Sequence, residues 1–174
     1  MKLNKIMLTA VLAFGVSSLA HAADQGHGKV TFTGSIIDAP CSISPETVDQ
    51  TVDMGQVSNV ALKNGGKSAP RQFDIKLEQC DNSTLKTVTT TFEGKASAAN
   101  KDLLGIVGTA SGASIAITDT ASNPIKLGTA TAPQNLGAGT NTLRFAAYLQ
   151  GDGASSAVVP GDFTAVADFK LAYQ

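Results

Sequence analysis

The stretch that most constrains the fold is the C-terminal segment 161–174, GDFTAVADFKLAYQ, in which apolar and polar side chains alternate. Its odd-numbered apolar positions are Phe163, Ala165, Ala167, Phe169, Leu171 and Tyr173. Most even-numbered positions are polar or charged, with Val166 and Ala172 as exceptions. This repeat of two predicts a half-buried β-strand. Because we expect no later strand, its second edge needs another partner, and a bare apolar edge would promote aggregation.

The N-terminus predicts export. Lys2 and Lys5 precede an apolar run of 11 residues at 6–16, and the small-residue triplet Ala-His-Ala ends at Ala22. This pattern is typical of a secretory signal peptide, and the run is too short to cross a bilayer. We therefore expect residues 1–22 to be cleaved off, with an uncleaved anchor as the alternative, and the remaining chain to be soluble after export.

The composition of the remaining 152 residues favours one globular domain with a sizeable core. Removal of the two N-terminal lysines leaves 11 basic against 14 acidic residues. This slightly acidic balance provides no basic stripe of the kind that binds nucleic acid. We therefore expect no nucleic-acid partner.

Two cysteines, Cys41 and Cys80, lie in the exported part. In an oxidising compartment an even pair predicts one disulfide, with two free buried thiols as the alternative. The 38 residues between them imply a stabilisation of about 4 kcal/mol through loop entropy. A zinc site would need more ligands than these thiols and a lone histidine can supply.

Short alternating segments separated by turn residues predict a β-sandwich. The alternating segments before the C-terminal one lie at 29–37, 73–77, 88–92, 115–117 and 143–149. Turn-rich clusters lie at 63–66, 121–124, 137–141 and 151–156. Long helical periodicity is absent, although residues 97–104 could form a helical turn or two.

The sequence favours no enzymatic chemistry. His27 is the one histidine left after export and is flanked by glycines, so we expect no catalytic triad, metal or cofactor. Asp152, Asp162 and Asp168 could in principle supply a glycosidase pair, but solvated surface charges are the favoured interpretation. We also expect no small-molecule substrate.

A second alternating segment lies near the start of the exported chain, GKVTFTGSII at 28–37. Its apolar phase comprises Gly28, Val30, Phe32, Gly34 and Ile36. A glycine in phase with large apolar side chains often marks a close backbone approach. Periodicity alone also allows an ordinary first strand of a complete sandwich.

Several features in combination resemble the pilin subunits of chaperone–usher fimbriae, especially the rod subunits of P-type and related fimbriae. They are the signal peptide, the segment GKVTFTGSIIDAPCSIS with Cys41 after an Asp-Ala-Pro turn, a second cysteine at Cys80, Gly161 fourteenth from the end, and the penultimate Tyr173. The resemblance covers essentially the whole exported chain.

The resemblance implies an all-β fold, an incomplete immunoglobulin-like β-sandwich of six strands whose seventh strand is supplied in trans. It implies a donor-strand extension at 23–37 and a pilin domain at 38–174. The donor residues would be Gly28, Val30, Phe32, Gly34 and Ile36. The acceptor and chaperone-binding residues would be Gly161, Phe163, Ala165, Ala167, Phe169, Leu171, Tyr173 and Gln174.

The resemblance also implies partners and a destination. A periplasmic chaperone would lend a strand to the groove and would anchor the carboxylate of Gln174 through basic residues. An outer-membrane usher, neighbouring copies of the chain, and a tip adhesin or adaptor would be the other partners in a cell-surface fimbria. A minor adaptor or terminator, a self-contained lectin-like domain and a secreted enzyme remain as alternatives.

Overall fold

The computed structural model describes residues 27–154 and 156–174. The predicted signal peptide at 1–22 and residues 23–26 of the predicted extension lie outside the described residues. The chain divides between Ile36 and Ile37 into an N-terminal segment and a C-terminal domain. The described part of the N-terminal segment contains no strand, so the alternation at 29–37 does not form a strand in the single chain.

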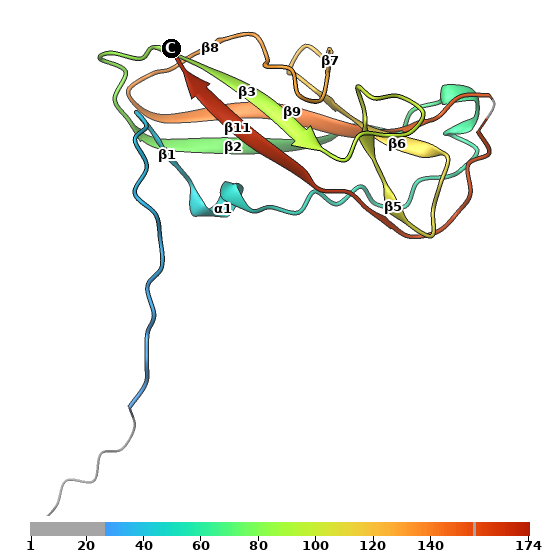
Figure 1. Cartoon of the computed structure of the whole chain (residues 1–174), viewed down its shortest axis with the longest axis horizontal. Helices are drawn as coiled ribbons and strands as arrows, with labels where there is room; N and C mark the ends of the chain where they lie inside the picture. The colour runs from blue at the N-terminus through green and yellow to red at the C-terminus, as the bar shows by residue number, and fades with distance from the viewer. Residues whose placement is uncertain (1–26, 155) are drawn as a thin grey trace, which may run out of the picture. The chain divides into compact units, whose positions relative to one another are not determined.

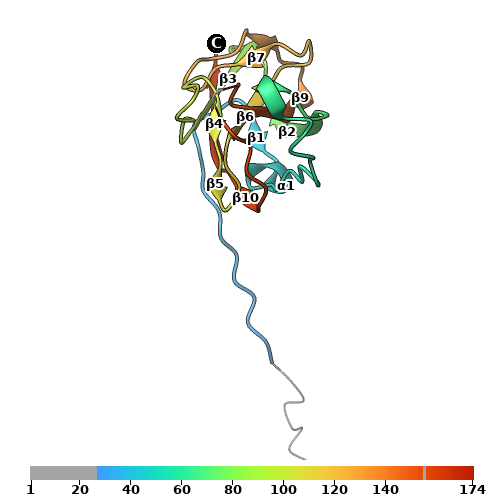
Figure 2. The same ribbon diagram turned by 90° about the vertical axis from the view of Figure 1, so that its right-hand side faces the viewer.

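The C-terminal domain is built almost entirely from antiparallel strands (Figure 1). The strands are β1 (Ser42–Ile43), β2 (Arg71–Cys80), β3 (Thr87–Gly94), β4 (Leu104–Gly105), β5 (Val107–Gly108), β6 (Ala113–Thr118), β7 (Pro124–Ile125), β8 (Gln134–Asn135), β9 (Gly139–Gly151), β10 (Phe163–Thr164) and β11 (Ala167–Tyr173). Two helical turns complete the domain, α1 (Pro45–Val48) and the 3-10 turn η1 (Lys63–Gly65), and Figure 2 gives the view at a right angle.

These strands form three sheets. The largest has the order β1-β2-β9-β6-β4, with β7 paired to β6. A second sheet has the order β11-β3-β8, and a third joins β10 to β5. In Figure 1 the β11–β3 ribbon crosses in front of β2 and β9, and side chains from both sheets share one core. The two larger sheets are therefore the layers of a sandwich.

The core lies between these layers because the strands alternate in sequence. Leu143, Phe145 and Leu149 of β9 are buried. The rings of Phe73, Phe92 and Phe145 pack together, with centroid separations of 5.0 to 6.1 Å. β9 begins at Gly139, so the predicted turn at 137–141 lies partly inside this strand.

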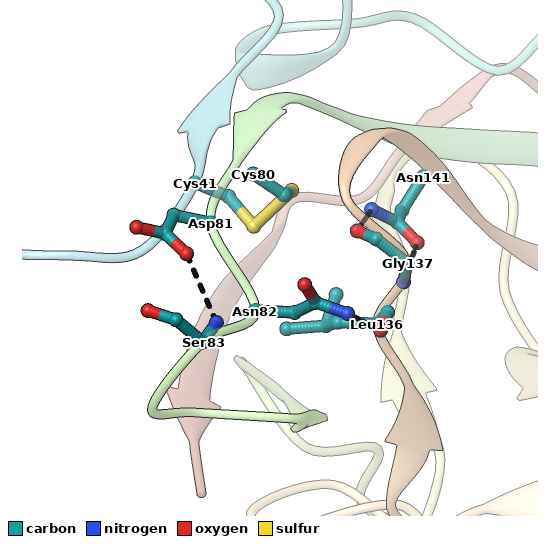
Figure 3. Close-up of a disulfide and its surroundings, with 8 residues drawn as sticks. All are labelled: Cys41, Cys80, Asp81, Asn82, Ser83, Leu136, Gly137 and Asn141. Atoms are coloured by element: carbon teal, nitrogen blue, oxygen red, sulfur yellow. Dashed lines mark hydrogen bonds between the residues drawn. A yellow bond between two sulfur atoms is a disulfide. The ribbon is translucent and has the colours of Figure 1, made fainter.

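A disulfide fixes one end of the domain (Figure 3). It joins Cys41 to Cys80, which confirms the pairing expected from the sequence. Just beyond it, the Asn82 side chain donates a hydrogen bond to the main-chain oxygen of Leu136. Hydrogen bonds from the main-chain N–H and the hydroxyl of Ser83 hold the pKa of the Asp81 carboxyl below its ordinary value. The Asn82 bond ties the β2–β3 connection to the segment before β9, and the Asp81–Ser83 bonds hold the connection itself.

The connection between β3 and β4 covers the outer face of the largest sheet instead of forming a helix. Leu103 packs with Ala116 and Tyr148 in a small buried cluster. Beside it, the buried hydroxyl of Ser114 is hydrogen-bonded to Ser97 and to the Asp152 carboxylate. The helical turn or two that the sequence allowed at 97–104 does not form a helix, and these contacts hold the segment against the sheet instead.

Candidate functional site

The last strand lies at the border of its sheet. β11 pairs with β3 along its whole length, from Ala167 opposite Gly94 to Tyr173 opposite Val88. On its other edge, no strand within residues 27–154 and 156–174 pairs with it. The main-chain N–H and C=O groups of that edge are thus available to another extended segment.

Burial along this stretch alternates strictly. Every odd-numbered side chain from Phe163 to Tyr173 is half-buried, and every even-numbered residue from Thr164 to Gln174 is exposed. The odd-numbered side chains pack against the two core clusters without being fully covered. Burial raises the pKa of the Tyr173 phenol. The row of half-buried side chains therefore has one uncovered side.

A groove of about 1240 Å³ runs beside the first part of this row, from Phe163 to Phe169, whereas the predicted site residues Leu171, Tyr173 and Gln174 do not line it. One wall is the stretch 158–169, and the opposite wall is the segment 47–59, which contains no strand after α1. The floor at one end holds Phe73 and Phe92, beside Phe169 of the wall. Small side chains also line the groove, among them Ala113, Ala147, Ala165 and Ala167, which belong to or pack against one core cluster. Its apolar interior is suited to the side chains of an inserted strand.

The start of this wall is clamped to the turn after β5. The main-chain oxygen of Asp162 accepts hydrogen bonds from the N–H groups of Thr109 (2.9 Å) and Ala110 (3.1 Å). In return, the Asp162 N–H donates to the Thr109 hydroxyl at 2.9 Å. β10 then pairs with β5. The predicted site residue Gly161 lies directly before this clamp.

The other end of the row is held by the chain's own backbone. The main-chain oxygen of Gln174 accepts hydrogen bonds from the N–H groups of Lys86 (2.7 Å) and Thr87 (2.8 Å). The N–H of Gln174 donates to the oxygen of Thr87 at 2.9 Å. β11 is thus fixed along one edge from end to end, and the groove beside it has a rigid wall.

The predicted donor residues lie in the N-terminal segment. Val30 and Phe32 are 75% and 89% exposed, and Ile36 is fully exposed. A Cβ atom added to Gly28 or Gly34 would meet no other atom within 4 Å. Such a run of exposed large apolar side chains is unusual for a soluble protein and indicates an interaction segment.

Sequence reasoning did not identify the wall at 47–59. Met54 of this wall is buried, and Val52 and Val57 are half-buried against the same core cluster. The only signal is the short alternation from Val52 to Gly55, which is too brief to predict a strand. Leu104 and Ile106, which also line the groove, come from a segment without clear periodicity.

The acidic residues considered for catalysis do not form such a site. Asp152 follows the end of β9 and is bonded to Ser114, whereas Asp162 and Asp168 are exposed on the groove wall. Within the described residues, no group of three or more metal-ligating side chains occurs. In the same part of the chain, no helix is long and apolar enough to span a bilayer.

Comparisons with known proteins agree with this geometry. Residues 30–174 match the family described as fimbrial protein. The Fimbria A protein of Serratia marcescens is 89% identical over 174 residues, covering 100% of both chains. The Major MR/P fimbria protein of Proteus mirabilis (strain HI4320) is 57% identical over 178 residues, covering 100% of both. A solved chaperone–usher pilus subunit superposes with a TM-score of 0.76 at 37% identity, over 86% of this chain and 97% of that one. This likeness confirms the incomplete, immunoglobulin-like all-β fold.

Proposed function

The chain belongs to the fimbrial protein family, and on this premise we propose that its copies are joined by donor-strand exchange. It is a structural protein rather than an enzyme, the major subunit of a fimbria, and it is exported and assembled outside the cell. In the proposed joint, the extension at 23–37 of one copy fills the groove of the pilin domain, 38–174, of the next. The observation that carries this proposal is the open apolar groove beside β10 and the start of β11, next to the unpaired edge of β11.

The lengths of the two partners are compatible. The donor residues Gly28–Ile36 would span about 30 Å as an extended strand, at about 3.3 Å per residue. The acceptor row Phe163–Tyr173 spans about 36 Å by the same measure. One extension can therefore cover most of one groove, and its alternation directs one apolar face inward.

The energetics favour a stable joint. Burying Val30, Phe32 and Ile36 would stabilise it by roughly 1.5–3 kcal/mol each. Each main-chain hydrogen bond to the free edge of β11 adds about 1 kcal/mol before the entropy of ordering the strand is subtracted. Because the inserted strand becomes part of the core, its release requires local unfolding of the domain.

The same groove is the proposed binding site for a periplasmic chaperone before assembly. A lent strand would cover the acceptor row, Gly161 to Gln174, and prevent aggregation during transit to an outer-membrane usher. Basic residues of the chaperone would hold the carboxylate of Gln174. A tip adhesin or adaptor would end the fibre.

The test places a charge on the inward face of the donor segment. Phe32→Asp should abolish polymerisation, because an aspartate in an apolar groove loses its hydration without gaining a partner. Thr33→Asp is the matched control, since it introduces the same charge at a neighbouring position in the outward phase. Electron microscopy of the cell surface measures fibres, and immunoblotting measures the exported subunit.

We expect exported subunit from both variants and fibres from Thr33→Asp alone. Normal fibres built from the Phe32→Asp subunit would overturn donor-strand exchange through this segment. Loss of fibres in both variants to the same degree would also contradict it, because the inward phase would then have no special role.

A further inference from the structure

The rim of the groove is acidic. Among the described residues that line it, the charged ones are Asp49 and Asp53 on one wall and Asp162 and Asp168 on the other. All four are exposed, and no lysine, arginine or histidine is among these lining residues. Since aspartate is negatively charged at neutral pH, a strand that enters the groove passes between two negative walls.

Three lysines of the described part of the chain form ion pairs with acidic residues that do not line the groove. In the described part of the chain, ion pairs join Lys76 to Glu46, Lys126 to Asp102 and Lys170 to Glu93. Lys170 lies on β11, as Asp168 does, and its Nζ is 2.8 Å from Oε2 of Glu93. The Arg71 guanidinium lies beside Gly55, but Arg71 does not line the groove. Among the described residues that line the groove, no basic side chain offsets the negative charge of the rim.

The part of the extension that would enter the groove carries the opposite charge. Residues 27–37, HGKVTFTGSII, contain Lys29 and no acidic residue, and Asp24, the acidic residue of the extension 23–37, precedes this part. Lys29 lies between Gly28 and Val30, in the outward phase of the alternation. When the apolar face enters the groove, this ammonium group therefore lies on the rim side, where its long side chain can reach a carboxylate.

We propose that the aspartate rim and Lys29 of a neighbouring copy select the donor strand electrostatically, so that basic strands enter the groove faster than neutral or acidic ones. This inference rests on the proposed donor-strand exchange. The apolar side chains would supply most of the affinity, whereas the rim charges would act on the association rate and its salt dependence. Exposed pairs of this kind change an equilibrium by about two- to five-fold.

The experiment uses the full chain carrying Phe32→Asp as acceptor, so that it does not donate its own strand. The probes are fluorescent peptides of residues 27–37 with the native sequence, Lys29→Gln, Lys29→Glu or Phe32→Asp. Association rates are measured by fluorescence anisotropy at low and high ionic strength. We expect rates in the order native, Lys29→Gln, Lys29→Glu, each step about two- to five-fold at low salt, with the differences nearly gone at high salt.

Substitutions of the rim aspartates in the acceptor identify which of them contacts Lys29. At least one of Asp49→Asn, Asp53→Asn, Asp162→Asn and Asp168→Asn should reduce the preference for the native peptide over Lys29→Glu. Replacement of that aspartate by lysine should reverse the preference. Glu78→Gln is the matched control, because Glu78 is exposed and does not line the groove.

Equal rates for the native, Lys29→Gln and Lys29→Glu peptides at low salt would overturn the rim inference while leaving donor-strand exchange intact. Failure of the native peptide to bind any better than the Phe32→Asp peptide would instead contradict the proposed function.

If the acceptor does not stay folded alone, wild-type and Lys29→Glu chains are co-expressed, and mass spectrometry of the fibres measures their ratio. The Lys29→Glu chain should be under-represented relative to its exported amount, and equal incorporation would overturn the inference.

Discussion

At the scale of single residues, Gly161 shows how tightly the start of the groove wall is built. A Cβ atom at this position would lie 2.5 Å from the Thr109 hydroxyl oxygen and 2.6 Å from the Ala110 nitrogen. Real Cβ atoms do not approach backbone atoms so closely, and the backbone here is already held by the hydrogen bonds around Asp162. The requirement for glycine therefore comes from packing between two chain segments.

Gly161→Ala should lower the free energy of unfolding by about 1–3 kcal/mol, because the clamp has to open to admit the methyl group. Urea unfolding of the full chain, followed by circular dichroism, measures the change. Gly137→Ala is the matched control, since its Cβ would meet only the Asn141 side-chain oxygen at an ordinary 3.6 Å. Equal unfolding midpoints for the two variants would contradict this prediction, because the clamp would then admit the methyl group without lowering the free energy of unfolding.

At the scale of elements, the strands that alternate over many residues could be predicted from the sequence. The alternation of apolar and polar residues correctly locates β2, β3, β6, β9 and β11. The elements that were missed, such as α1, most of the two-residue strands and the wall at 47–59, are short or lack a period, and tertiary packing determines them. The sequence allowed a helical turn or two at 97–104, where the structure has no helix, because local sequence does not reveal the contacts of this segment with the outer face of β6.

The candidate site, too, could be predicted only in part from the sequence. The inward row of β11 could be predicted, since burial follows its alternation. The floor of the groove could not, because it combines residues such as Phe73, Leu104 and Ala147 from distant parts of the chain. The joint between donor and groove stays a prediction, as it involves two copies of the chain.

The disulfide links two elements, the start of β1 and the end of β2. Its sequence separation of 39 residues predicts that replacement of both cysteines by serine lowers the free energy of unfolding by about 4 kcal/mol. Urea unfolding of this double variant measures the loss, with the exposed neighbour Ser42→Ala as control. An unchanged midpoint would mean that the hydrogen bonds around Asn82 and Asp81 suffice to hold this end.

At the scale of the whole molecule, the proposed joint gives each copy one donor segment and one groove. An interface between different surfaces of identical copies is head-to-tail, and it produces a filament when the rotation between copies does not close a ring. A chain without residues 23–37 would keep its groove and lose its donor. It could then occupy only one end of a filament, so its share of the subunit pool would limit filament length.

This geometry predicts how filaments shorten. When the truncated chain is co-expressed with the full chain, mean filament length should fall roughly in inverse proportion to the truncated share, because each truncated copy adds one filament end. Electron microscopy measures the length, and mass spectrometry of purified filaments measures the share. A full chain carrying Thr33→Asp, co-expressed at the same levels, should leave the length unchanged. Truncated copies incorporated in large amounts without shortening would require a second joint between subunits, independent of the groove beside β11.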